Sequence, residues 1–143
     1  MSFKENIKNS VGILFFKEKP LVEISNNEKA TGYGFLTLII AGIALAISQL
    51  SLVGLILFPI YLIIGLFVGY SIFHLIAKFI LGGKATGTQY FRSLSNAFVI
   101  YWFTFIPTIG VFLQFIAGIW FIAINIFVLH KVHKLSKPKA IIL

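Results

Sequence analysis

The sequence contains no cysteine and few charged residues. The absence of cysteine excludes disulfide bonds and thiolate chemistry. Charged residues make up 11% of the chain and hydrophobic residues 59%, a balance too apolar for a soluble domain of 143 residues. These scarcities exclude a disordered chain, a disulfide-stabilised secreted fold and a soluble enzyme core, and they indicate a membrane protein.

Acidic residues are scarcer than basic ones, with 4 Asp and Glu against 12 Lys and Arg. In a soluble chain such a surplus would indicate nucleic acid, but beside long apolar runs it marks membrane topology and contacts with anionic lipids. We therefore expect no nucleic-acid partner. All four acids precede the first apolar run, which leaves no carboxylate for a proton relay or a hydrolase within the membrane. They are Glu5, Glu18, Glu23 and Glu28.

Two long stretches without charge, residues 30–77 and 93–130, set the fold class. One crossing needs about 20 apolar residues, so each stretch holds about two. The sequence predicts an all-α membrane protein with four transmembrane helices in two hairpins. The expected crossings run from about residue 33 to 50, from the turn at 48–54 to about 78 or 81, from 91 to 106 and from 111 to 129. Pro59 is an alternative first turn, and residues 82–88 and 107–110 form the other two.

An amphipathic helix is predicted before the first crossing, at residues 2–16. Ser2 and Glu5 have the spacing of a capping box, and the apolar residues recur at helical spacing opposite a charged side. Such a helix lies in the membrane interface or packs on the membrane domain itself. Pro20 ends it, and a polar connector follows. The expected divisions are residues 1–29 (helix and connector), 30–131 (four-helix domain) and 132–143 (basic tail).

The positions of the cations predict the topology. They lie before the first crossing, in the central loop or in the tail, and the hairpins at 48–54 and 107–110 carry none. The positive-inside rule then places both termini and the central loop in the cytoplasm. The cations are Lys4, Lys8, Lys17, Lys19 and Lys29; Lys78, Lys84 and Arg92; Lys131, Lys134, Lys137 and Lys139.

No motif predicts a catalytic residue, a cofactor or a metal site. The glycines and lysine of residues 82–87 resemble a phosphate loop but fail its spacing. His130 and His133 share a helical face, yet two imidazoles do not complete a zinc site, so we expect interfacial histidines. His74 lies four residues before Lys78, which can extend to water.

Helix packing and cytoplasmic contact account for the remaining candidates. Gly65 and Gly69 have the spacing that lets two helix backbones approach. Neutral polar side chains inside a membrane more often join helices by hydrogen bonds than bind a solute. In this chain they are Gln49, Asn96, Thr104, Gln114 and Asn125. Contacts with anionic headgroups or an acidic partner are predicted for Gly82, Gly83, Lys84, Arg92, Lys131, Lys134, Lys137 and Lys139.

Several short motifs in the second half of the chain follow a familiar order. They are His74-Leu75-Ile76-Ala77-Lys78, residues 81–89 (LGGKATGTQ), the Pro107 hairpin, Ile119-Trp120, Val132-His133-Lys134-Leu135-Ser136 and Lys139-Ala140. In this order they resemble the Yip-domain family of integral membrane proteins, over roughly residues 74–140. The resemblance implies a helical bundle with no known catalytic activity, linked in eukaryotes to vesicle traffic, membrane shaping and recruitment of Ypt/Rab-type small GTPases.

The chain departs from that family in two ways: it lacks the usual last helix after Lys139-Ala140, and only residues 1–29 precede the first crossing. We therefore expect a prokaryotic-type member in the cell membrane. The expected function is that of a non-enzymatic membrane organiser, scaffold or accessory subunit that acts through the lipid bilayer, anionic lipids and a membrane-protein partner or further copies of itself. A small oligomeric transporter or channel is the alternative, with Gln49, Asn96, Gln114 and Asn125 as its polar pathway.

Overall fold

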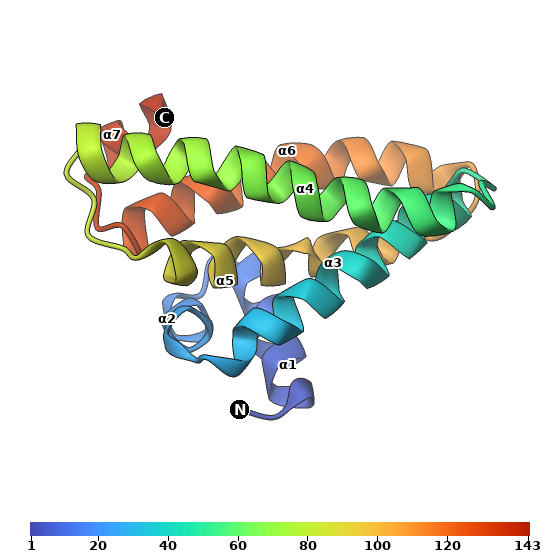
Figure 1. The fold of residues 1–143 in the computed structure, drawn as a ribbon, viewed down its shortest axis with the longest axis horizontal. Helices are drawn as coiled ribbons and strands as arrows, with labels where there is room; N and C mark the ends of the chain where they lie inside the picture. Colours follow the sequence, from blue (N-terminus) through green and yellow to red (C-terminus); the bar gives the residue numbers. More distant parts are fainter.

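The computed structural model describes all residues, 1–143, and they form an all-helical protein (Figure 1). In chain order the elements are α1 (Phe3–Leu14), α2 (Glu18–Asn26), α3 (Lys29–Ser48), α4 (Gly54–Leu75), the π-helical turn η1 (Ile76–Ile80), α5 (Gly87–Ala97), the 3₁₀ helix η2 (Phe98–Thr104), α6 (Ile109–Lys131) and α7 (Lys137–Ile142). Figure 1 shows α4, α5 and α6 along the long axis, with α3 crossing obliquely and with α1 and α2 on one flank.

Three helices are long and apolar enough to cross a membrane. They are Lys29–Ser48, Gly54–Ile80 and Ile109–Lys131, with mean hydropathies of 2.0, 2.3 and 2.3. The segment expected to form another crossing, residues 91–106, is divided between α5 and η2. The change of helix type coincides with a run of aromatic and β-branched residues, FVIYWFT, whose side chains lose rotamer freedom in an α-helix. The structure therefore has three uninterrupted helices of membrane length, where the sequence predicted four crossings.

The first hairpin joins α3 and α4 through an unusually close contact. The turn predicted at residues 48–54 is confirmed, because α3 ends at Ser48 and α4 begins at Gly54. Pro59, the alternative turn, lies buried inside α4. It packs against Gly42 of α3, where any Cβ would overlap the backbone of Pro59. The two helices thus meet at a glycine that the sequence analysis did not single out.

The N-terminal region forms two helices rather than one helix and a connector. The capping box is confirmed, because Ser2 Oγ accepts from the Glu5 amide (3.3 Å) and the Ser2 amide donates to Glu5 Oε2 (2.7 Å). Pro20 does not end the helical region as predicted. It lies in the first turn of α2, where a proline removes no intrahelical hydrogen bond. Both helices pack on α5, and α1 also contacts α3 and η2.

The long helices differ in how much of their surface the protein covers. Within the most apolar stretch of each helix, the share of residues buried inside the protein is 44% in α3, 11% in α4 with its π turn and 17% in α6. The inner pair is α3 and the α5–η2 segment, which pack along one another. The outer pair, α4 and α6, packs on the inner pair with hardly any contact between its own members. Apolar side chains of α4 and α6 therefore face outward.

Candidate functional site

Several of the candidate residues meet at one end of the bundle. This basic end comprises residues 74–92 and 130–139, where α4 and its π turn end, α5 begins and α6 passes into α7. The Lys84 amide donates to the carbonyl of His133 (2.9 Å), and Lys139 Nζ donates to the carbonyl of Leu81 (3.1 Å). These bonds fasten the loop after the π turn to the segment after α6.

Two histidines form the centre of the basic end. Nδ1 of His74 lies 3.2 Å from Nε2 of His133, at hydrogen-bonding distance. His133 is fully buried, and the Tyr90 ring packs edge-on against it with 5.0 Å between centroids. On the other side lies Gly83, where an added Cβ would come within 2.5 Å of His133 Nδ1. The imidazole of His133 is thus enclosed by α4, α5 and a glycine of the loop.

The enclosure keeps His133 uncharged. Its Nδ1 atom is buried and has no hydrogen-bond partner, so a proton there would be poorly solvated. Burial lowers the pKa of His133 to about 4, with smaller contributions from the neighbouring His74 and Lys78. At neutral pH this ring therefore carries no charge, and the positive charge of the basic end comes from its lysines.

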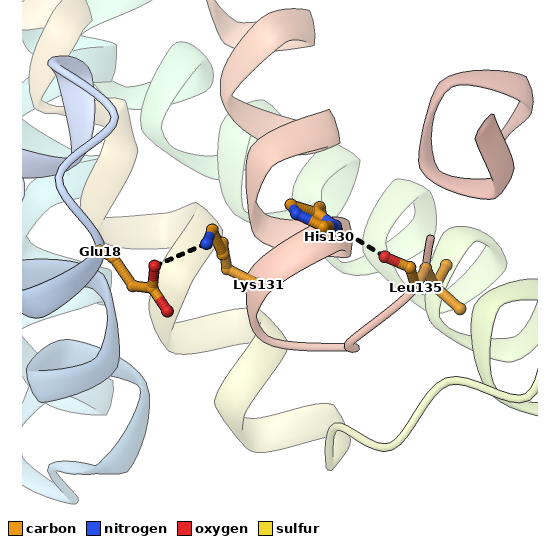
Figure 2. A network of polar contacts seen from close by, with 4 residues as sticks. All are labelled: Glu18, His130, Lys131 and Leu135. Carbon is orange, nitrogen blue, oxygen red and sulfur yellow. Dashed lines mark hydrogen bonds and ion pairs between the residues drawn. The ribbon is translucent and has the colours of Figure 1, made fainter. Parts of the chain in front are cut away.

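The lysines of the basic end are mostly exposed. Five of them are exposed: Lys78, Lys84, Lys134, Lys137 and Lys139. Lys131 differs, because its Nζ lies 2.6 Å from Glu18 Oε2 of α2 in the one ion pair of the structure (Figure 2). All four acids lie in residues 5–28. Apart from the contact of Lys131, the basic end therefore presents positive charge without neighbouring carboxylates.

The predicted contact residues do not all belong to this surface. Arg92 points toward the N-terminal region, where its Nε donates to Thr31 Oγ1 (2.8 Å) and its Nη1 to the carbonyl of Ser25 (3.3 Å). Arg92 thus fastens α5 to α2 and α3. Gly82 has a φ of 78° and ends the π turn, a conformation that glycine adopts without strain.

The two histidines of the tail do not share a site. His133 pairs with His74, whereas His130 Nδ1 lies 2.7 Å from the carbonyl of Leu135 (Figure 2). His133 is buried inside the protein, because the chain turns after α6 and covers this ring with the loop. No group of three metal-type side chains occurs.

The neutral polar residues lie in three separate places. Asn96 Oδ1 accepts from Asn6 Nδ2 (2.7 Å), and Asn96 Nδ2 donates to the carbonyls of Ala30 (2.9 Å) and Arg92 (2.8 Å). At the far end of the bundle, Gln114 donates to Ser48 Oγ and lies 3.5 Å from Gln49. These groups join helices at different positions along the molecule rather than lining one polar pathway.

The third polar contact belongs to the basic end, where the hydroxyl of Tyr90 donates to Asn125 Oδ1 (2.6 Å). Thr104 is buried and donates to the carbonyl of Tyr101 within its own helical segment. Gly65 and Gly69 pack against nothing, since a Cβ added at either would meet no atom within 4 Å.

Two features of the basic end were not predicted. The pairing of His74 with His133 brings together residues 59 positions apart, and no local pattern indicates it. A local signal did exist for the start of α5, because Thr86 and Gln89 form a second capping box, in which the Gln89 amide donates to Thr86 Oγ1 (3.2 Å). Recognising it places the start of the helix at Gly87 instead of residue 91.

The arrangement offers positive charge and hydrogen-bond donors at the end of an apolar bundle, a combination suited to binding anions at a membrane surface. No protein-family model, curated protein or solved structure matches the chain.

Proposed function

We propose that the chain is a non-enzymatic, multi-pass membrane protein of the Yip-like class, with four crossings. Three crossings are α3, α4 with its π turn, and α6. The α5–η2 segment supplies the fourth, because an α-helix rises about 1.5 Å per residue and a 3₁₀ helix about 2.0 Å. Residues 87–104 then span about 30 Å, close to the thickness of the hydrocarbon core. Arg92 lies within this segment, and its side chain bonds to Thr31 and to the carbonyl of Ser25 at the cytoplasmic flank instead of facing lipid.

The proposed orientation follows from charge. Both hairpin ends, near residues 49–53 and 105–108, are free of cations, whereas the other end carries the lysines described above. The positive-inside rule then places the basic end, α1, α2 and both termini on the cytoplasmic side. The helix α1 packs across the flank of the bundle. This position supports the proposal that α1 lies in the interface between membrane and water.

The exposed lysines of the basic end are the observation that carries the proposed role. Each cation near an anionic membrane surface contributes about 1 kcal/mol of attraction, and five of them lie on one compact, carboxylate-poor surface. The protein acts as a membrane organiser, scaffold or accessory subunit by binding anionic headgroups or an acidic partner there.

The composition of the native particle tests this role. We would purify the full chain from its native membrane in a mild detergent and measure the mass of the intact complex. The expected result is a reproducible partner or tightly held anionic lipid that is lost when Lys78, Lys84, Lys134, Lys137 and Lys139 are changed to Gln. The matched control changes Lys4, Lys8, Lys17, Lys19 and Lys29 to Gln. Equal loss in both variants, or a bare wild-type particle, would overturn the proposal.

A further inference from the structure

An apolar groove lies between the two outer helices. It has a volume of about 220 Å³, and α4 and α6 form its walls while Leu94 and Phe98 of the inner pair form its floor. The α4 wall runs from Tyr61 to Phe73 and includes Gly65 and Gly69, and Asn125 lies in the α6 wall. The groove exists because α4 and α6 pack on the inner pair and hardly touch each other.

The dimensions of the groove match one acyl chain. From Tyr61 to Phe73 the α4 wall extends about 18 Å, at about 1.5 Å per residue. One leaflet of the hydrocarbon core is about 15 Å thick. Gly65 and Gly69 leave the wall open, with no atom within 4 Å of an added Cβ. A single row of methylene groups can lie along a wall of this length.

The groove is polar at the end nearest the lysines. Asn125 lines it and uses Oδ1 to accept from Tyr90 (2.6 Å), so its amide nitrogen remains to donate. Phe73, also in the wall, is followed by His74 and, four residues later, by the exposed Lys78. A ligand in the groove therefore meets an apolar channel, then an amide donor, then positive charge. That order is the order of acyl chain, ester carbonyl and phosphate in a phospholipid.

We infer that the groove between α4 and α6 binds one acyl chain of an anionic glycerophospholipid, with its ester carbonyl at Asn125 and its headgroup at Lys78 and the neighbouring lysines. The anionic class follows from charge complementarity, since the basic end holds five exposed lysines and the acids lie in residues 5–28. This inference rests on the proposed membrane orientation and names a lipid class for the surface proposed above.

Native mass spectrometry of the full chain in detergent tests the groove. The added lipid is palmitoyl-oleoyl phosphatidylglycerol, with the matching phosphatidylcholine as its zwitterionic counterpart. Gly65→Leu combined with Gly69→Leu places two bulky side chains in the groove, and their Cβ atoms clash with no other part of the protein. Gly32→Leu is the control, because it adds the same side chain at an exposed helical glycine with equally open surroundings, outside the groove.

The expected result is that wild type and Gly32→Leu retain phosphatidylglycerol equally. The groove-filled variant should lose it by about tenfold, the cost of excluding about two methylene groups. Lys78→Gln should reduce the preference for phosphatidylglycerol over phosphatidylcholine while leaving retention of phosphatidylcholine unchanged.

Three outcomes would overturn the inference. Unchanged retention in the groove-filled variant would mean that lysines at the surface hold the lipid, which contradicts the groove and leaves the proposed function standing. Loss of a dimer in that variant, without loss of lipid, would make a second copy of the chain the occupant. Equal retention of both lipids by wild type would refute the anionic specificity.

Discussion

Helices α3 and α4 have similar hydropathy, 2.0 and 2.3, yet 44% of the apolar stretch of α3 is buried within the protein against 11% of that of α4. Their side chains explain the difference. The buried face of α3 consists mostly of small residues, among them Ala30, Gly34, Ala41, Gly42, Ala44 and Ala46, whereas α4 is rich in Leu, Ile and Phe. Small residues permit close helix packing, while large apolar ones suit contact with lipid. Residue size, more than hydropathy, separates α3 from α4.

The strongest test of this comparison places the same side chain on both helices. Gly42→Leu should lower the free energy of unfolding by about 3 kcal/mol, because the new side chain would overlap the backbone of Pro59 and force the two helices apart. Gly65→Leu should leave stability unchanged or slightly higher, since it meets open space and gains helix propensity. Thermal unfolding in detergent, followed by helical circular dichroism, measures both. Equal destabilisation would contradict the division into inner and outer helices.

The second prediction concerns pH and the enclosed histidine. The folded chain keeps His133 neutral down to a pKa of about 4, whereas the unfolded chain takes up this proton near the ordinary value of 6.5. Between these values the unfolded chain binds more protons, so stability is full above pH 6.5 and falls as the pH drops toward 4. The loss attributable to His133 is about 3 kcal/mol at most, at about 1.4 kcal/mol per unit of pKa.

His133→Gln isolates this effect, because glutamine keeps a polar group opposite His74 and does not titrate in this range. The variant should be less stable than wild type at pH 7 and lose less stability between pH 6.5 and 4. His130→Gln is the control, since His130 is only partly buried and faces the carbonyl of Leu135. If the stability of wild type and of His133→Gln changed equally with pH, His133 would have the same pKa in the folded and the unfolded chain, which would contradict the prediction.

Local signals predicted the parts of the fold that depend on local physics. The long apolar runs located three membrane-length helices, and the capping box at Ser2 located the start of α1. The turn residues at 48–54 and 107–110 located the two hairpins, since α6 begins at Ile109 and η2 ends at Thr104. Each of these features is set by residues close together in the chain.

The remainder depends on contacts distant in sequence. The close approach of Gly42 to Pro59 and the pairing of His74 with His133 follow from tertiary packing, which no periodicity encodes. The sequence predicts a connector after Pro20 because proline often ends a helix, but Pro20 lies in the first turn of α2, a position that favours a helix. The spacing of Gly65 and Gly69 predicted a helix-packing face, and within this chain no other helix packs against it.

The third prediction concerns the polar junction that fastens the N-terminal helices to the inner pair. Asn96→Ala should lower stability by about 2 kcal/mol, because it leaves the buried side-chain amide of Asn6 without its partner. Asn9→Ala is the control, since the Asn9 side chain donates to Glu23 at an exposed position. Chemical unfolding of both variants distinguishes them. If Asn96→Ala left the free energy of unfolding unchanged, apolar contacts alone would hold the N-terminal helices on the bundle.

The smallest effect is expected for the ion pair between Glu18 and Lys131, which links α2 to the end of α6 (Figure 2). Their side chains are 58% and 31% exposed, so water and salt screen the attraction, and such pairs contribute about 0.5 kcal/mol. A double-mutant cycle with Glu18→Gln and Lys131→Gln should give a coupling of this size that declines with added salt. Glu28→Gln, an exposed acid outside any ion pair, controls for the loss of one negative charge.

The N-terminal helices are also held by Asn96 and by Trp120, whose Nε1 donates to the carbonyl of Leu14 (2.9 Å). A coupling above about 2 kcal/mol would therefore mean that the pair is shielded from solvent, as lipid headgroups packed over this flank would shield it.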